Sequence, residues 1–278
     1  MIPKNAPTAT VLLRVYNGER YLAEAVESIL HQQFSDFELL VVDDGSTDAT
    51  AAILDQYAKD ARVRIIRQPN RGLSLSTRRG VEEARGTYVA IMDADDRSHH
   101  DRLEKQIAFL LSHPEHVLVG SALRIIDENG QPTGYRRYPL EDSTIREASM
   151  LYNPFGHSSI CFRRADAIAC GNYTTEFETA EDFDFNVRLR MRGKGANLPE
   201  ALTDYRIHRG SVKAEKLRRQ LADTIQLRAL IQRRYHYRYT VQARLVDILQ
   251  RALLLVPAVM VNRLVELVFY RLSSAESP

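Results

Sequence analysis

Acidic residues that follow an apolar run are the first feature of the sequence that could carry out chemistry. The run at residues 88–92 leads directly into Asp93, Asp95 and Asp96. Alternate residues of a strand point the same way, so we expect Asp93 and Asp95 to share a face and Asp96 to point away. Two convergent carboxylates need a counter-charge, which a hard divalent cation can supply while water and substrate phosphates complete its shell. A solvated loop after a buried strand is the plain alternative.

A second acidic pair, Asp43 and Asp44, ends another β-favouring run. Ser46 and Asp48 follow where a helix is expected to begin, and they are good caps for its first amides. The same helix end could receive an anion or a ribose hydroxyl. An acid at this place is also typical of a dinucleotide-binding dehydrogenase. Such an enzyme needs Gly-x-Gly-x-x-Gly after its first strand, but the segment 14–21, RVYNGERY, has one glycine.

The elements that must position these acids alternate between strands and helices over the first hundred residues. Strands are predicted at 9–16, 37–45, 63–68 and 87–96, and amphipathic or capped helical segments lie between them. This alternation indicates βαβ units and an α/β fold with a mostly parallel sheet. Ligands of such sheets bind beyond the carboxyl ends of the strands, and both acidic groups fall at those ends.

The composition is that of an ordinary soluble globular protein. The chain has 278 residues, of which 44% are hydrophobic and 27% are charged. Cys161 and Cys170 make neither a metal-ligand spacing nor a disulfide framework, so a reducing cytoplasm is the default location. The first residues lack the basic and apolar regions of a signal peptide.

The charge is distributed unevenly along the chain. Residues 209–244 contain ten Lys or Arg and two acidic residues, a balance of +8, whereas residues 1–208 carry about −6. We therefore place a soft boundary near Gly210. Beyond it, the longest uncharged run of the tail, 252–262, has 11 residues, against roughly 20 that are needed to span a bilayer.

The tail, residues 211–278, is basic first and amphipathic afterwards, which predicts a helical extension. Two interpretations stay open. The helices could lie on an anionic membrane close to a lipid-linked acceptor, peripheral to the inner face of the cytoplasmic membrane, and this is the one we favour. They could instead pack on the body of the protein or in a homodimer interface. One short Arg-Tyr cluster in a nearly neutral chain is poor evidence for nucleic acid, so we expect none as a partner.

Several long stretches resemble the inverting glycosyltransferase family 2, which has the GT-A fold. The match is specific over residues 11–50, and it continues through segments such as NPFGHSSICFRR and YRIHRGS to cover about residues 8–212. The resemblance implies a GT-A catalytic domain over 1–210: a Rossmann-like, mostly parallel sheet flanked by helices. The nucleotide-sugar part would span about 1–97 and the acceptor part about 98–210, with the helical tail after them.

The resemblance also implies an activity. Family members transfer a sugar from a nucleotide diphosphate sugar, most often a UDP-sugar, to an acceptor hydroxyl with inversion. The acceptor would be a glycan or a lipid-linked glycan in surface polysaccharide or lipopolysaccharide biosynthesis, and Mn²⁺ or Mg²⁺ would assist. A sugar nucleotidyltransferase, or an inactive module that binds nucleotide sugars, stays open as an alternative.

Matching the family motifs to this chain assigns roles to individual residues. The positions implied for nucleotide-sugar binding are Val15, Tyr16, Glu19, Asp43, Asp44, Ser46, Arg78, Asp93, Ala94 and Asp95. Asp95 and His208 would hold the metal, and His157 would lie near the acceptor. Asp182 would be the catalytic base, with Glu181 beside it. Two departures from the family pattern stand out: Arg14 replaces a proline and Arg79 an asparagine.

The chemistry asks for the same parts independently of the family. A single displacement at an anomeric carbon needs a base for the acceptor hydroxyl and charge stabilisation for the departing diphosphate. Asp182 can supply the first, and a cation on Asp95 the second. The plain alternative for Glu181, Asp182 and Asp184 is an acidic first turn of a helix, which the helix dipole favours in any case.

Overall fold

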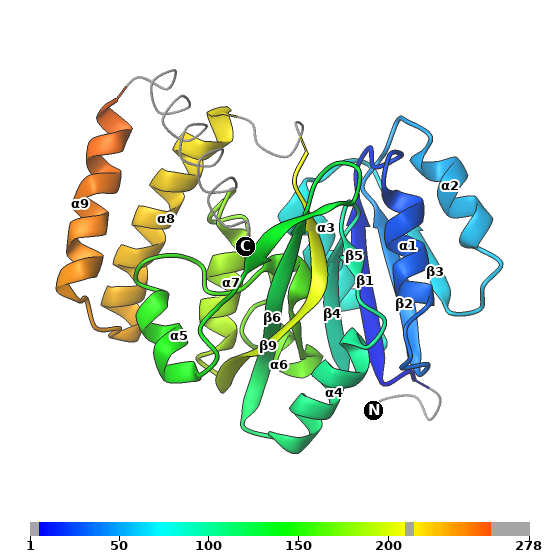
Figure 1. Cartoon of the computed structure of the whole chain (residues 1–278), viewed down its shortest axis with the longest axis horizontal. Helices are drawn as coiled ribbons and strands as arrows, with labels where there is room; N and C mark the ends of the chain where they lie inside the picture. Colours follow the sequence, from blue (N-terminus) through cyan, green and yellow to red (C-terminus); the bar gives the residue numbers. More distant parts are fainter. Residues whose placement is uncertain (1–5, 209–213, 257–278) are drawn as a thin grey trace.

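The computed structural model of the chain describes residues 6–208 and 214–256 (Figure 1). The elements in these ranges are β1 (Ala9–Val15), α1 (Leu22–Leu30), β2 (Phe37–Asp43), α2 (Thr50–Tyr57), β3 (Val63–Arg67), α3 (Leu73–Glu83), β4 (Tyr88–Asp93), β5 (Arg97–Ser98), α4 (Arg102–Ser112), β6 (His116–Ile126), β7 (Pro132–Arg136), α5 (Asp142–Ala148), a short 3-10 turn (His157–Ser159), β8 (Cys161–Arg163), α6 (Arg164–Ala169), α7 (Glu181–Leu189), β9 (Lys194–Arg206), α8 (Ala214–Tyr235) and α9 (Val241–Leu255).

The strands of the described residues form one nine-stranded sheet in the order β3-β2-β1-β4-β8-β6-β9-β5, with β7 paired to β6. The block β3-β2-β1-β4 is parallel throughout, as the alternation of strands and helices predicts. Beyond it, β8 runs antiparallel between β4 and β6, and β6 pairs with β9 in parallel. The predicted α/β architecture, a mostly parallel sheet flanked by helices, is confirmed.

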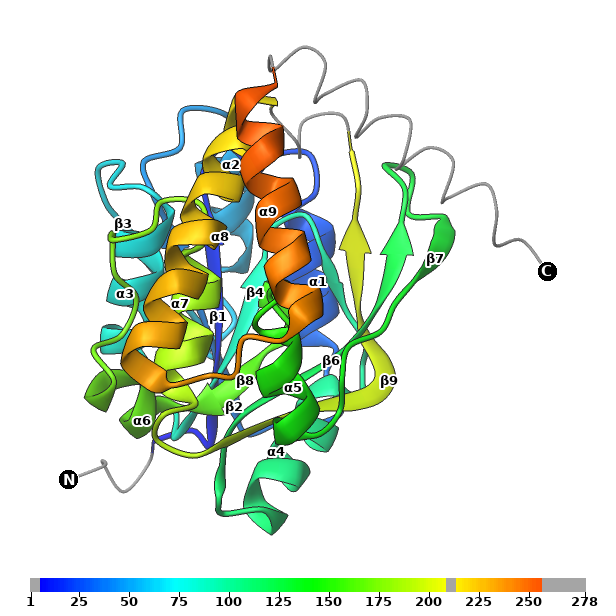
Figure 2. The ribbon, with the colours of Figure 1, turned by 90° about the vertical axis from the view of Figure 1, so that its left-hand side faces the viewer.

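Alternation along the central strands divides the core into two layers. Leu13 of β1 and Ala90 of β4 face α1 and α4, whereas Leu12 and Ile91 face α3, α6 and α7 (Figure 2). All four side chains are at most 1% exposed. Helices therefore exclude water from both faces of these central strands. Strands that are buried on both faces have continuous apolar sequences. Polar residues can face solvent only beyond the ends of these strands.

The second helix differs from the expectation in detail. It begins at Thr50, after Ala49, so Ser46 does not cap it; Asp48 does accept a hydrogen bond from the Thr50 N–H group, at 3.0 Å. Leu54 is the apolar residue that it buries completely, whereas Ala52 is exposed. Six residues, 44–49, separate β2 from α2, so the helix begins later than the sequence pattern predicts.

The helical extension packs on the body through α8. Leu227 and Ile231 of α8 join a buried cluster with Phe183 and Val187 of α7, and Ala243 of α9 completes it. For α8, the structure thus agrees with the interpretation in which the tail packs on the body of the protein. No helix of the described residues is long and apolar enough to cross a bilayer. The boundary predicted near Gly210 lies outside the described residues, so the division into domains stays a prediction.

Candidate active site

A pocket of about 720 Å³ opens where the parallel strands β1, β2 and β4 end together. Its lining comes from the loop after β1, the segments after β2 and β3, the start of α3, the turn after β4 and the end of β9: Arg14, Val15, Tyr16, Asn17, Gly18, Arg20, Tyr21, Asp44, Asn70, Gly72, Leu73, Ser76, Asp93, Ala94, Asp95, Tyr205 and His208. This is the edge at which ligands of open α/β sheets bind.

The structure brings together most of the residues that the sequence assigns to nucleotide-sugar and metal binding. Those that line the pocket are Val15, Tyr16, Asp44, Asp93, Ala94, Asp95 and His208. Glu19, Asp43, Ser46 and Arg78 do not line it, and their contacts show what they do instead.

Asp44 is held in place by backbone and side-chain donors. Its Oδ1 accepts hydrogen bonds from Gln68 Nε2 at 2.7 Å and from the Arg71 N–H at 2.9 Å. Its Oδ2 accepts from the Gly72 N–H, also at 2.9 Å. The carboxylate is 4% exposed, so these donors replace most of its water. It is therefore fixed in the pocket wall with its orientation set before a ligand arrives.

Reciprocal hydrogen bonds tie the loop after β1 to the start of α2. Asn17 donates its N–H to Ser46 Oγ at 2.9 Å, and Glu19 accepts from the Ala49 N–H at 2.9 Å. Asp43 accepts from the Ser46 N–H at 3.0 Å. Asn17 adopts a positive φ of 52°, a conformation that asparagine tolerates better than most residues. Glu19, Asp43 and Ser46 therefore shape the two loops that frame the pocket.

Arg78 points away from the pocket. Its Nε donates to Glu82 at 2.9 Å, one turn further along α3. Its Nη1 lies within 3.4 Å of the Gly171 carbonyl and 3.3 Å of the Tyr173 carbonyl. The structure places this arginine between α3 and the segment after α6, so its role toward a phosphate stays a prediction.

Asp93 forms a partly buried ion pair with Arg14. The two residues are paired in register on β4 and β1, which places Arg14 Nη2 at 3.0 Å from Asp93 Oδ1. His157 Nδ1 lies 3.9 Å from the same oxygen. Burial raises the pKa of Asp93, but Arg14 and His157 oppose it and hold the pKa well below its ordinary value. Asp93 is thus a permanent anion at the floor of the site.

Asp95 lies in the turn that follows β4, because the strand ends at Asp93. Asp93 and Asp95 both line the pocket, as expected. The reason given from the sequence, alternation along one strand, is wrong, because Asp95 is not part of the strand. Asp96 does point away, at 1% exposure, and accepts from the Arg206 N–H at 2.8 Å. Burial and the neighbouring Asp93 raise the pKa of Asp95, and His208 partly opposes this rise.

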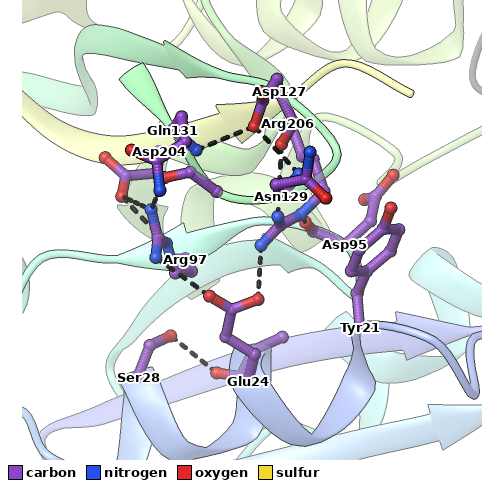
Figure 3. A network of polar contacts seen from close by, with 12 residues as sticks. Tyr21, Glu24, Ser28, Asp95, Arg97, Asp127, Asn129, Gln131, Asp204 and Arg206 are labelled. Carbon is purple, nitrogen blue, oxygen red and sulfur yellow. Dashed lines mark hydrogen bonds and ion pairs between the residues drawn. The ribbon is translucent and has the colours of Figure 1, made fainter.

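Arg206 holds the turn of Asp95 against α1 (Figure 3). Its Nε donates to the Asp95 carbonyl at 2.8 Å, and its Nη2 to Glu24 at 2.5 Å. Its guanidinium lies over the Tyr21 ring, 4.3 Å from the centroid. At 2% exposure it is a buried cation whose donors are distributed over three elements. Its role was not predicted from the sequence, although it stands two residues before His208 in the segment YRIH.

Asp95 and His208 offer two ligand atoms to a metal. Asp95 Oδ2 and His208 Nε2 lie 3.2 Å apart at the pocket, although they come from the ends of β4 and β9. Within residues 6–208 and 214–256, no group of three or more His, Cys, Asp or Glu side chains is arranged to hold a metal. Two protein ligands suit a cation that completes its shell with substrate phosphates and water, so the residues fit such an ion.

Glu181 and Asp182 occupy the first turn of α7, where the helix dipole favours negative charge. Asn153 donates its side-chain amide to Asp182 Oδ2 at 2.8 Å, which orients this carboxylate. Glu181 is 7% exposed, and burial together with the adjacent Asp182 raises its pKa to about 7. Asp184 lies elsewhere, bound to Arg188 at 2.7 Å in a structural ion pair.

A chain of polar side chains joins the pocket to α7. His157 Nδ1 lies 3.5 Å from Arg14 Nη2, and its Nε2 lies 3.0 Å from the Tyr173 hydroxyl. The Tyr173 ring in turn stacks on Phe185 of α7, with 4.0 Å between the centroids. Arg14 and His157 lower the pKa of Glu181, against the larger effect of burial. Tyr173 was not identified from the sequence, because no local pattern marks it, and Asn153 was not either, although it opens the segment NPFGHSS.

Comparison with known families gives one match that covers more than half of the chain. The model described as "Glycosyl transferase family 2" matches residues 10–171. A putative glycosyltransferase of Bacillus subtilis, EpsE, is 36% identical over 206 residues, which are 71% of this chain and 72% of that protein. The amylovoran biosynthesis glycosyltransferase AmsE of Erwinia amylovora is 33% identical over 204 residues, 71% of this chain and 75% of that protein.

Solved structures share the fold at low sequence identity. Residues 1–349 of S. aureus TarS, crystallised with UDP-GlcNAc, superpose with a TM-score of 0.64 and 19% identity, covering 87% of this chain and 79% of that one. The mannosyltransferase PcManGT from Pyrobaculum calidifontis, in complex with GDP-Man and Mn²⁺, gives a TM-score of 0.64 and 19% identity, covering 98% and 83%. The GT-A fold that the sequence predicts is confirmed by these neighbours.

Proposed function

Because the chain belongs to glycosyl transferase family 2, we propose that it transfers a sugar from a nucleotide diphosphate sugar to an acceptor hydroxyl, with inversion. The observation that carries the proposal is the pocket that Asp44, Asp93 and Asp95 line together where β1, β2 and β4 end. We further propose a UDP-sugar as the donor, in line with the UDP-GlcNAc complex of TarS. Surface polysaccharide biosynthesis is the proposed pathway, in line with the name of AmsE.

The nucleoside would bind between the loop after β1 and Asp44. Tyr16 is 52% exposed and lines the pocket, so its ring offers a face on which a base can stack. Val15 would contact the base beside it, and Asp44 would accept from it or from the ribose. Glu19, Asp43 and Ser46 would act through the loops that they hold, and Ala94 would contact the ribose or the sugar.

Asp95 and His208 would hold Mn²⁺ or Mg²⁺ against the diphosphate. When bound, such an ion neutralises the charge that develops on the departing nucleoside diphosphate. The Mn²⁺ complex of PcManGT supports this part of the proposal. Arg206, which fixes the Asp95 carbonyl, would keep the two ligand side chains together.

Asp182 would accept the proton of the acceptor hydroxyl as this oxygen attacks the anomeric carbon. The bond between that carbon and the diphosphate oxygen breaks as the new bond forms on the opposite face, so the configuration inverts. Asn153 holds the carboxylate in one orientation, which lowers the cost of aligning it. Glu181, with its pKa of about 7, would keep a proton near neutral pH and leave the negative charge on its neighbour.

His157 would contribute to the acceptor side of the site, for a glycan or a lipid-linked glycan. Its ring links Arg14 to Tyr173 and packs edge-on against the Tyr173 ring, with 5.8 Å between the centroids. Three further points stay predictions: contact of Arg78 with the donor phosphates, a cytoplasmic location, and a homodimer.

A ligand panel tests the proposed function directly. The full chain would be mixed with UDP, UDP-N-acetylglucosamine, GDP-mannose, UTP or NAD, with and without Mn²⁺, and its thermal unfolding followed. We expect stabilisation by a nucleoside diphosphate and its sugar, larger with Mn²⁺, because a ligand that binds only the folded state raises its stability. Preference for UTP with release of pyrophosphate in the presence of a sugar phosphate would indicate the nucleotidyltransferase alternative, and stabilisation by NAD alone would contradict the proposal.

A further inference from the structure

Helix α9 carries large apolar side chains that are open to solvent. Their exposed fractions run from 57% for Leu245 to 87% for Leu255. Spacings of three, four and seven residues relate them, so they lie on one face of the helix, here called the apolar stripe of α9. The stripe consists of Val241, Leu245, Ile248, Leu249 and Leu255. The opposite face is engaged: Ala243 is buried, and Asp247 faces Arg228 of α8.

The surface around the stripe is positively charged. The exposed cations of residues 218–256 are Arg218, Arg219, Arg233, Arg234, Arg238, Arg244 and Arg251. Both acids of this range are partly buried and already engaged. Asp223 accepts from the Thr179 hydroxyl at 2.7 Å, and Asp247 pairs with Arg251 at 2.7 Å. Arg244 and Arg251, seven residues apart on α9, lie along one edge of the stripe.

The stripe faces away from the body of the protein. Figures 1 and 2 show α9 on the outer side of α8, so that α8 separates it from the sheet. The views also show that α9 ends at the same end of the molecule as β1, β2 and β4, where the pocket opens. A flat partner that contacts α9 therefore approaches the molecule from the side of α8, near the open end of the site.

We propose that the apolar stripe of α9 docks on a bilayer that contains anionic phospholipids. An amphipathic helix with an apolar face and arginines at its edge inserts at the boundary between headgroups and acyl chains, and the arginines meet the headgroup phosphates. Charge complementarity selects this occupant over a second copy of the chain. Two hairpins facing each other would bring their exposed arginines together, with no exposed acid among residues 218–256 to pair with them.

Vesicle flotation of the full chain tests the proposal without a sugar substrate. Vesicles of phosphatidylcholine alone would be compared with an equimolar mixture of phosphatidylcholine and phosphatidylglycerol. We expect wild type to float with the anionic vesicles, and less as salt is added, because salt screens the arginines. The double substitution Leu245→Gln and Ile248→Gln should lower the bound fraction at least about tenfold, because it removes two apolar anchors. Arg244→Gln should weaken binding to the anionic vesicles alone.

A matched control separates the stripe from apolar exposure in general. Leu111 on α4 is 64% exposed, the same fraction as Leu249, so Leu111→Gln should bind vesicles like wild type. Both variants change exposed residues, and unchanged thermal midpoints would show that they fold. Failure of wild type to bind anionic vesicles, or equal binding by the double variant, would overturn the proposal. So would a wild-type dimer in solution that the double variant converts to a monomer, since the stripe would then be a dimer interface.

Discussion

The carboxylates at the end of β4 and those at the start of α7 have opposite electrostatic environments. Asp93 is paired with Arg14 at 3.0 Å, and its pKa is held low. Among the described residues neither Glu181 nor Asp182 forms an ion pair, and the pKa of Glu181 rises to about 7. The end of β4 therefore carries a fixed negative charge, with which a cationic ligand or a hydroxyl group can interact. The start of α7 carries carboxylates that have no ion-pair partner among the described residues, and such a group is suited to accept a proton.

The largest effect is expected when the proposed base, Asp182, is removed. Asp182→Asn keeps the shape of the side chain and its contact with Asn153 but cannot accept a proton. We expect turnover to fall about 10³-fold, the range of a general base, while Kd for the donor stays within about twofold. Single-turnover kinetics and calorimetry measure the two effects. Asp184→Asn, on the same helix turn, serves as the control: it should affect stability and leave the turnover of the folded enzyme near that of wild type.

The opposite region is tested by removing the cation that fixes Asp93. Arg14→Leu leaves a partly buried carboxylate, 23% exposed, without its partner, and we expect the free energy of unfolding to fall by about 2 kcal/mol. Denaturant titration measures this loss. Arg14→Leu combined with Asp93→Asn should recover part of it, because the unpaired charge is gone. Arg67→Leu, which breaks an exposed ion pair with Asp55, should cost less than about 1 kcal/mol. Equal losses in both arginine variants would contradict the distinction between the two regions.

Asp95 sharpens the comparison, since its counter-charge is expected to arrive with the ligand. Asp95→Asn should weaken Mn²⁺-dependent binding of UDP by about 30-fold, and metal-free binding little. Calorimetry with and without Mn²⁺ separates the two. Asp55→Asn, an exposed acid of α2, is the control. If Mn²⁺ raised the affinity of Asp95→Asn for UDP as much as it does for wild type, the assignment of Asp95 as a metal ligand would be wrong.

The smallest effect concerns Glu181 and depends on pH. Its folded pKa of about 7 lies above the ordinary 4.5, so the native state binds the extra proton between these values. Stability from this group is therefore present at low pH and is lost as the pH rises through 7. Glu181→Gln removes the loss, and we expect the variant to gain on the order of 1 kcal/mol relative to wild type between pH 5 and pH 8. Thermal unfolding at the two pH values measures it, and a constant difference would contradict the assignment.

The part of the fold that the sequence predicted correctly is the part with regular periodicity. Each of the first strands and the first helix has a regular apolar pattern, and the structure has each of them close to its predicted residues: β1, α1, β2, β3 and β4. β9 was missed, although it lies inside the sheet. Its 13 residues include Pro199, Glu200 and several exposed positions, so no clear alternation marks it. Its place depends on long-range pairing with β6, which a local pattern does not encode.

The candidate site shows the same limit. Asp44, Asp93 and Asp95 were found because acids after apolar runs are a local signal. Arg206 and Asn153 were not, since what marks them is contact with residues far away in the chain: Arg206 with the Asp95 carbonyl, Asn153 with Asp182. Strand alternation also failed beyond Asp93, where the chain turns and the period of two no longer applies.

The place of His208 after β9 has a consequence for when the enzyme matures. The carboxylate that it meets, Asp95, leaves the ribosome more than a hundred residues earlier, and α7 with Asp182 leaves it between the two. Domains are made from the amino terminus onward at about 5–20 residues per second, so the first 97 residues exist for several seconds without their partner ligand. A nascent chain can form most of the donor pocket during that time, but it carries neither the histidine nor the base. With the proposed roles of His208 and Asp182, the chain can therefore transfer a sugar only after β9 has joined the sheet.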